Sequence, residues 1–172
     1  KLLPKQRLEL EKIINKNTGL VIVNGPTGSG KSTTLYTILN YVNKSEVNVV
    51  TLEDPVEVII NGVNQMMVNS KEGVSFANGL RSIMRQDPDV IMVGEVRDEE
   101  TAVMAVRAAL TGHKVYTTIH STEPREVYLR LEEMGIKSYL IRESLVGIIS
   151  QRLIKMLCDS CKEEEIITYT GS

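Results

Sequence analysis

The sequence has few cysteines, no long apolar run and almost no net charge, and each shortage argues against a class of protein. Its two cysteines, Cys158 and Cys161, lie together near the end of the chain, which is a poor basis for a disulfide framework and suits a reducing compartment. No apolar run approaches the roughly 18 residues that a membrane-spanning helix needs, and no signal peptide opens the chain. A net charge of −2 gives no electrostatic reason to expect a nucleic-acid partner.

The composition that remains is that of an ordinary globular protein. The 172 residues are 42% hydrophobic and 24% charged, enough for one domain with a sizeable core. We expect that domain over residues 1–157 and a short cysteine-containing segment over residues 158–172. Because the chain begins at Lys1 without a methionine and stops in a polar tail, we expect a fragment of a longer protein.

A glycine-rich stretch organises the rest of the chain. Residues 25–32, Gly-Pro-Thr-Gly-Ser-Gly-Lys-Ser, fit the phosphate-loop pattern G-x-x-x-x-G-K-[ST] without a mismatch. A short apolar strand, 20–23, precedes the pattern and a helical run, 33–43, follows it. The glycines let backbone N–H groups converge on an anion, and the start of the helix adds partial positive charge. An ordinary glycine turn between a strand and a helix is the alternative.

This loop predicts a nucleoside triphosphate site. Lys31 would reach the β- and γ-phosphates, and the hydroxyl of Ser32 would bind Mg²⁺. The predicted nucleotide-binding residues are Gly25, Pro26, Thr27, Gly28, Ser29, Gly30, Lys31, Ser32 and Thr33.

Helical and strand patterns alternate along the chain and predict an α/β fold, a mostly parallel sheet flanked by helices. Two β-rich runs around Asn61-Gly62 predict a hairpin over residues 58–68. Ser75 and Asp98 are expected helix N-caps. The other expected helices cover 5–16, 33–43, 124–135 and 138–146, and the expected strands cover 20–23, 47–52, 90–93 and 115–119. Residues 151–157 fit either a strand or a short helix, and we expect a strand.

Polar groups follow four of the expected strands: the phosphate loop, the Glu53/Asp54/Glu57 cluster, Glu95 and His120. Right-handed crossovers bring the carboxyl ends of such strands to one edge, where ligands bind. Glu95 could polarise the attacking water or hold Mg²⁺ through its water shell. The alternatives are a solvated glutamate, a charged turn at 53–57 and a structural histidine.

Further candidates are less specific. His120 is suited to sensing the γ-phosphate, whereas His113 follows a helix end and could simply interact with that helix dipole. Arg81, Arg85 and Arg97 are either surface cations or donors to transition-state charge across a subunit boundary. Arg97 is included among the candidate catalytic residues.

Four motifs together resemble the ATPases that drive type II secretion and type IV pilus assembly, over the C-terminal RecA-like domain of that family. The motifs are a Walker A sequence at 25–33, an Asp box at 51–57, a Walker B region at 85–98 and a His box at 112–121. The resemblance implies a RecA-like P-loop NTPase fold and a Mg²⁺-dependent ATP-hydrolysing motor. It also implies that Glu95 is the catalytic glutamate, that Glu53 and Glu57 are Asp-box acids, and that His113 and His120 are the His-box pair.

The resemblance also carries expectations about the whole protein. The intact protein would form a homo-hexamer that works with an inner-membrane platform protein, in the cytoplasm at the inner face of the bacterial cell membrane. Family members have an N-terminal domain that supplies arginines and part of the nucleotide pocket. This chain lacks that domain, so we expect an isolated monomer with weak turnover.

Two features depart from the family pattern. The second histidine is followed by Ser121-Thr122 where the family usually has Thr-Asn, which leaves that contact open. Cys158 and Cys161 resemble the first half of a four-cysteine zinc motif. A structural zinc site takes four ligands, so Zn²⁺ is expected only if a second cysteine pair exists outside this chain.

Three other functions fit parts of the sequence. A pilus retraction ATPase shares the motifs, but the Cys158/Cys161 pair counts against it. A nucleotide-gated scaffold would bind nucleotide and scarcely hydrolyse it. A DNA-translocating ATPase would need a basic groove that the net charge of −2 does not supply.

Overall fold

The computed structural model describes residues 2–69 and 73–163. The helices are α1 (Pro4–Ile14), α2 (Lys31–Val42), α3 (Phe76–Ile83), α4 (Glu99–Leu110), α5 (Pro124–Glu133) and α6 (Ser138–Ser144). The strands are β1 (Gly19–Asn24), β2 (Val49–Glu53), β3 (Asn64–Met67), β4 (Val90–Val93), β5 (Lys114–Ile119) and β6 (Leu145–Ser150).

These strands form a six-stranded sheet in the order β3-β2-β4-β5-β1-β6. All five pairings between neighbouring strands are parallel, which confirms the predicted sheet. Strands β1, β2, β4 and β5 are buried along their whole length. A parallel sheet covered on both faces needs apolar residues at successive positions, which explains the continuous apolar runs in the sequence.

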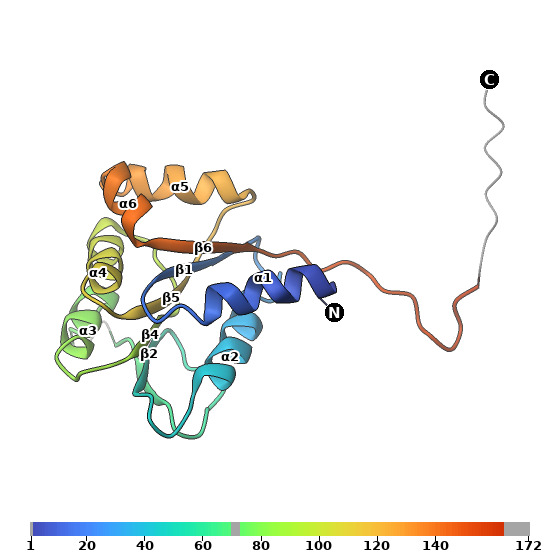
Figure 1. Ribbon diagram of the computed structural model, residues 1–172, viewed down its shortest axis with the longest axis horizontal. Coiled ribbons are helices and arrows are strands. Elements are labelled where there is room, and N and C mark those ends of the chain that lie inside the picture. Colours follow the sequence, from blue (N-terminus) through green and yellow to red (C-terminus); the bar gives the residue numbers. More distant parts are fainter. Residues whose placement is uncertain (1, 70–72, 164–172) are drawn as a thin grey trace.

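Helices cover both faces of the sheet (Figure 1). One core cluster joins Leu20, Ile22 and Leu52 of the sheet to the buried sides of α3, α4, α5 and α6. A second cluster joins Val21 and Val23 to α2 and the end of α1. Alternate residues of one strand therefore belong to different cores, as the two-residue period of a strand requires. None of the helices in the described ranges has both the length and the apolar character that crossing a membrane demands.

Both expected N-caps are present. The side chain of Ser75 accepts a hydrogen bond from the N–H of Asn78, and Asp98 accepts one from Thr101 at 2.8 Å. Each cap satisfies a backbone donor that the first turn of a helix leaves free. The two helices that follow them, α3 and α4, begin where the sequence predicted.

The predicted hairpin over residues 58–68 is wrong. Only β3 forms, and it pairs parallel to β2, with Val50 opposite Asn64. The side chain of Gln65 accepts from the N–H of Ile60 and donates to the carbonyl of Val58. The first β-rich run thus bonds to a side chain instead of a partner strand, and the buried side chain of Ile60 anchors it to the core.

The expected strand at 151–157 is also wrong, because the last strand is β6, six residues earlier. Strand β6 pairs with β1, and the pairing ends where β1 ends, with Asn24 opposite Ser150. Residues 151–157 form neither helix nor strand, and Ile154 is 84% exposed. Gln151 and Arg152 still form hydrogen bonds with the folded body, and the chain that follows runs away from it (Figure 1). The proposed domain boundary near residue 157 stays a prediction.

Candidate functional site

The glycine-rich loop connects β1 to α2, and α2 begins at Lys31 directly after it. Gly28 and Gly30 have φ of +75° and +84°, in the left-handed region that favours glycine. A Cβ on Gly25 would lie 2.4 Å from the carbonyl oxygen of Gln151, whereas a Cβ on Gly28 would meet nothing within 4 Å. The loop is therefore packed tightly at Gly25 and open at Gly28, where an anion could approach the backbone.

Lys31 closes the loop. Its Nζ donates hydrogen bonds of 2.9 Å to the carbonyl oxygens of Gly25 and Pro26. Burial lowers the pKa of the Lys31 ammonium, and the charge of Glu95 acts in the opposite direction. The cation is thus held beside the loop backbone, with the side chain 8% exposed. The glycines, the ammonium and the start of α2 fit a phosphate group, whose charge they would neutralise.

A cavity of about 560 Å³ lies beside the loop and is lined by most of the predicted residues, Gly25, Pro26 and Ser29 excepted. The polar groups that line it come from the ends of β1, β2, β4 and β5, as the sequence predicts for a parallel sheet. They include Thr27, Lys31, Ser32, Thr33, Glu53, Asp54, Glu57, Glu95, Arg97, Thr118 and His120. The expected meeting of four strand ends at one site is therefore observed.

Glu95 lies two residues after β4 in the interior of this cavity. Its carboxylate forms an ion pair with Arg97 at 2.5 Å, and its other oxygen lies 3.7 Å from Nε2 of His120. The side chain of Glu95 is 12% exposed, against 66% for Arg97 and 52% for His120. Thr118 holds the two strand ends together by donating to the carbonyl of Gly94 at 2.8 Å. Glu95 is consequently the most enclosed side chain of the three and lies beside two more exposed basic groups.

Glu53 is buried, and both oxygens of its carboxylate accept hydrogen bonds. Its carboxylate accepts hydrogen bonds from Tyr36, from Thr51 at 2.5 Å and from Gln65 at 3.0 Å. The Tyr36 oxygen in turn accepts the N–H of Glu57 at 3.2 Å. Burial, and then the hydrogen bond to Glu53, raise the pKa of Tyr36 to about 12. Tyr36 therefore links α2 to the acidic segment 53–57, and Glu57 itself is exposed.

Three of the weaker candidates lie elsewhere. His113 follows α4 at the opposite end of β5, where its Nδ1 lies 3.0 Å from the carbonyl oxygen of Ala108. His113 therefore contacts the end of α4, which agrees with the alternative that this histidine interacts with the end of the preceding helix. Arg81 pairs with Glu100 at 2.6 Å on the surface, and Arg85 contacts Ser82 at 3.4 Å.

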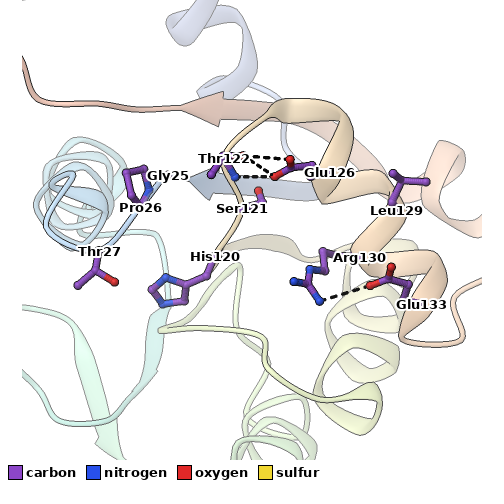
Figure 2. Close-up of a pocket in the computed structure, with 10 residues that line it drawn as sticks. All are labelled: Gly25, Pro26, Thr27, His120, Ser121, Thr122, Glu126, Leu129, Arg130 and Glu133. Carbon is purple, nitrogen blue, oxygen red and sulfur yellow. Dashed lines mark hydrogen bonds and ion pairs between the residues drawn. The ribbon is translucent and has the colours of Figure 1, made fainter.

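A second cavity, of about 630 Å³, lies on the other side of the loop (Figure 2). Gly25, Pro26 and Thr27 form one wall, and α5 forms the other with Leu129, Arg130 and Glu133. Figure 2 shows the Arg130–Glu133 pair on α5 and the contacts of Glu126 with Thr122. The N–H of Thr122 lowers the pKa of Glu126. His120 and Thr27 border both cavities.

Cys158 and Cys161 share a turn in which the N–H of Cys161 lies 3.4 Å from the carbonyl oxygen of Cys158. A hydrogen bond from the backbone of Ser160 lowers the pKa of the Cys158 thiol, and both thiols are exposed and free. Within residues 2–69 and 73–163 no group of three or more His, Cys, Asp or Glu side chains is arranged to hold a metal. The half zinc motif stays a prediction, and residues 164–172 of its segment lie outside the described residues.

Sequence reasoning missed two residues of this region. Tyr36 was not recognised because it lies beside the apolar stripe of α2 and carries no motif. The sequence pattern favours a strand at Gln151, yet the residue lies outside any strand and its side chain donates to the carbonyl of Ser29 at 2.7 Å. Both contacts join segments far apart in the chain, so no local signal marks them.

The family model described as "Type II/IV secretion system protein" matches residues 1–170. The chain is 48% identical over 161 residues to type II secretion system protein E of Dickeya dadantii, covering 94% of this chain and 32% of that protein. It is 52% identical over 152 residues to type II secretion system ATPase E of Vibrio cholerae (88% and 30%). It is 49% identical over 159 residues to the type IV pilus assembly ATPase PilB of Acinetobacter baylyi (92% and 28%). The chain thus spans about a third of the length of these relatives.

Solved structures give a consistent result. A crystal structure of the pilus retraction motor PilT with bound ADP matches with a TM-score of 0.77 at 38% identity, covering 89% of this chain and 46% of that chain. The ATPase DotB of Legionella pneumophila matches with a TM-score of 0.73 at 33% identity (88% and 44%). The fold is accordingly that of the RecA-like secretion ATPases, as the motifs implied.

Proposed function

This chain belongs to the type II/IV secretion system protein family, and we propose that it is the ATP-hydrolysing motor domain of a protein that powers type IV pilus assembly or extension of a type II secretion pseudopilus. The observation that carries the proposal is the gathering of Lys31, Ser32, Glu53, Glu95 and His120 around one cavity beside the phosphate loop. These groups come from four segments of the chain. Their meeting supplies both an anion-binding cradle and an acid suited to activating water.

The phosphate loop would bind the substrate. Its backbone N–H groups and the ammonium of Lys31 would hold the β- and γ-phosphates of ATP, and the start of α2 favours negative charge there. Ser32, the second residue of α2, would hold Mg²⁺, which neutralises charge on the phosphates when bound. The ADP held by the PilT structure supports a nucleotide as the ligand.

Glu95 would orient and deprotonate the attacking water. In hydrolysis, the water oxygen bonds to the γ-phosphorus, the bond from that phosphorus to the bridging oxygen breaks, and ADP leaves with the bonding electrons. The water proton passes to the Glu95 carboxylate and then to solvent or phosphate. Arg97 and His120, which lie beside Glu95, would offset the charge that develops on the phosphoryl oxygens.

The two acids of the 53–57 segment, Glu53 and Glu57, would have different roles. Glu53 accepts three hydrogen bonds and is nearly inaccessible, so its carboxylate would shape the β2 end of the cavity. Glu57 is exposed at the same cavity, where its carboxylate would help to hold Mg²⁺ through bound water. We propose that both acids support metal and phosphate binding, and that Glu95 alone activates water.

The family context supplies the partners in this proposal. The intact protein would assemble as a homo-hexamer in the cytoplasm, against an inner-membrane platform protein, and Arg97 would act at or near the subunit boundary. Residues 158–161 would contribute to a zinc site only with a second cysteine pair from elsewhere.

A retraction motor is the second candidate, because the PilT structure shares the fold at 38% identity. The assembly function is favoured, since the secretion and assembly ATPases match at 48–52% identity. The Cys158/Cys161 pair points in the same direction.

ATP turnover by the intact protein that contains this domain tests the proposal against a nucleotide-gated scaffold. We expect Glu95→Gln to lower kcat by about 10²–10⁴-fold, since general-base catalysis contributes on that order, while ATP affinity is retained. The matched control is Glu143→Gln, at an exposed position of α6 away from the cavity. Unchanged turnover in Glu95→Gln, or a parent protein that binds ATP without hydrolysing it, would contradict the proposal.

A further inference from the structure

Gln151 lies directly after β6 and forms hydrogen bonds with the phosphate loop and with the strand and helix on either side of it, β1 and α2. Its backbone N–H donates to the carbonyl of Asn24 at 2.9 Å. Its side-chain Nε2 donates to the carbonyl oxygen of Ser29 at 2.7 Å, and its Oε1 accepts from the hydroxyl of Thr34 at 2.5 Å. The amide thus spans from the middle of the loop to the first turn of α2.

Two glycines of the loop leave room for the close approach of Gln151. A Cβ added at Gly25 would lie 2.4 Å from the carbonyl oxygen of Gln151, and one at Gly30 would lie 2.8 Å from its Nε2. Two of the three glycines of the motif therefore lie against Gln151. Glycine at these positions serves the approach of this residue as well as the curvature of the loop.

The segment that carries Gln151 is fixed on both sides. The hydroxyl of Ser150 donates to the side-chain oxygen of Asn24 at 2.5 Å. The guanidinium of Arg152 donates to the carbonyl of Thr122 and lies 3.7 Å from a carboxylate oxygen of Glu123. Gln151 is therefore held between the loop and the start of α5, so its amide has a defined position from which to hold the loop.

The contact with Ser29 has a consequence for the phosphate site. In a trans peptide the carbonyl and the following N–H point in opposite directions. Holding the Ser29 carbonyl against Gln151 therefore turns the N–H of Gly30 away from Gln151. Gly30 and Lys31 both line the cavity of about 560 Å³. The Thr34 contact fixes the amide orientation, because its Oε1 is engaged by a hydroxyl and its Nε2 is left to donate.

We propose that Gln151 is a positioning residue for nucleotide binding, which orients the Ser29–Gly30 peptide of the phosphate loop toward the phosphates through its bonds to Ser29 and Thr34. The inference rests on the proposed function, because it concerns the same nucleotide site. Gln151 lies behind the loop and acts on the phosphates through the loop backbone.

The test is the affinity of the chain for ADP, measured by calorimetry in parent and variants. Gln151→Ala removes both side-chain bonds, and we expect ADP affinity to fall roughly 5- to 20-fold, the range for losing one to two hydrogen bonds. Gln151→Glu keeps an acceptor for Thr34 and places a carboxylate against the Ser29 carbonyl, so its affinity falls at least as far. Gln86→Ala, at an exposed glutamine, is the matched control and keeps the parent affinity.

Variants of Thr34 distinguish a specific effect on ADP affinity from a general loss of folding. Thr34→Val removes the hydroxyl and is expected to lower ADP affinity about threefold, whereas Thr34→Ser retains the donor and restores it. The double variant Gln151→Ala/Thr34→Val should bind no worse than Gln151→Ala alone, because the two residues act through one contact. If Gln151→Ala does not fold, the Thr34→Val and Thr34→Ser pair decides the question.

The outcomes separate the two proposals. Parent-like ADP affinity in Gln151→Ala, or equal affinities in Thr34→Val and Thr34→Ser, overturns the role of Gln151 and leaves the nucleotide site intact. If the parent and Lys31→Ala both fail to bind ADP, or bind it equally, the proposed function itself fails.

Discussion

The carboxylate of Glu95 lies 3.7 Å from Nε2 of His120, although the two residues follow different strands. Strands β4 and β5 are neighbours in the parallel sheet, so their carboxyl ends deliver both side chains to one place. The pair faces the same cavity as Lys31 and Ser32. An acid, a histidine and a phosphate-binding loop are therefore arranged around one volume of about 560 Å³.

Replacing Lys31 by alanine removes the ammonium that spans the loop. If the loop binds ATP as proposed, the triphosphate would lose a positive charge held beside the loop. We expect ATP affinity to fall by at least about 100-fold, since hydrogen bonds to charged groups are worth roughly twice neutral ones. Isothermal calorimetry with ATP measures the change, and Lys155→Ala, in the exposed segment, is the control. Equal affinities in the parent and Lys31→Ala would refute the role given to the loop.

Tyr36→Phe tests the link between α2 and the acidic segment. The variant leaves the buried Glu53 carboxylate without one donor and the N–H of Glu57 without its acceptor. We expect the free energy of unfolding to fall by about 1–3 kcal/mol, the cost of an unsatisfied buried polar group. Urea titration measures it against Tyr41→Phe, at a tyrosine that is 54% exposed. A change no larger than that of the control would show that the bond to Glu53 contributes little.

Gly25→Ala and Gly28→Ala test the effect of crowding in the loop, because both glycines have a positive φ and only Gly25 lies against other atoms. At Gly25 the new Cβ meets Gln151 and Ser29 at 2.4 and 2.6 Å, so the loop must shift and nucleotide binding is lost. At Gly28 the Cβ enters open space and only the positive φ is penalised, by about 1–2 kcal/mol. Urea unfolding and ADP calorimetry on both variants measure the contrast. Equal losses in the two variants would argue against close packing at Gly25.

We expect Lys114 to make the free energy of unfolding depend on pH, because its ammonium is buried. Burial, and then the charge of Lys16, lower the pKa of Lys114 from 10.5 to about 8, while its Nζ donates to the carbonyl of Ile13. Between these values the unfolded chain binds more protons than the folded chain, so stability rises with pH. From pH 7 to 9.5 the parent should gain about 1–2 kcal/mol relative to Lys114→Met.

Urea unfolding at several pH values measures this difference, and the comparison cancels tyrosines that titrate in both proteins. Lys155→Met, at an exposed lysine, should follow the parent throughout. A parent and Lys114→Met with parallel pH profiles would show that Lys114 keeps its ordinary pKa in the folded protein.

The parts of the fold that the sequence predicts correctly are those determined by interactions between residues close together in the chain. Three features depend only on neighbouring residues and can be predicted without knowledge of distant segments. They are the phosphate-loop pattern, the helix caps at Ser75 and Asp98, and the apolar run at 90–93. The parallel sheet follows from alternating strands and helices. The meeting of Glu95 and His120 then follows from the rule that parallel strands end at one edge.

The features that only the tertiary structure determined are contacts between segments that are distant in the chain. Strand β3 pairs with β2 at one edge of the sheet. Strand β6 ends where β1 ends, which moves the last strand from 151–157 to 145–150. Tyr36 and Gln151 belong to the site through hydrogen bonds to Glu53 and Ser29, across 17 and 122 residues of sequence. Such bonds depend on how the strands are ordered in space, and no periodicity or motif in the chain encodes that order locally.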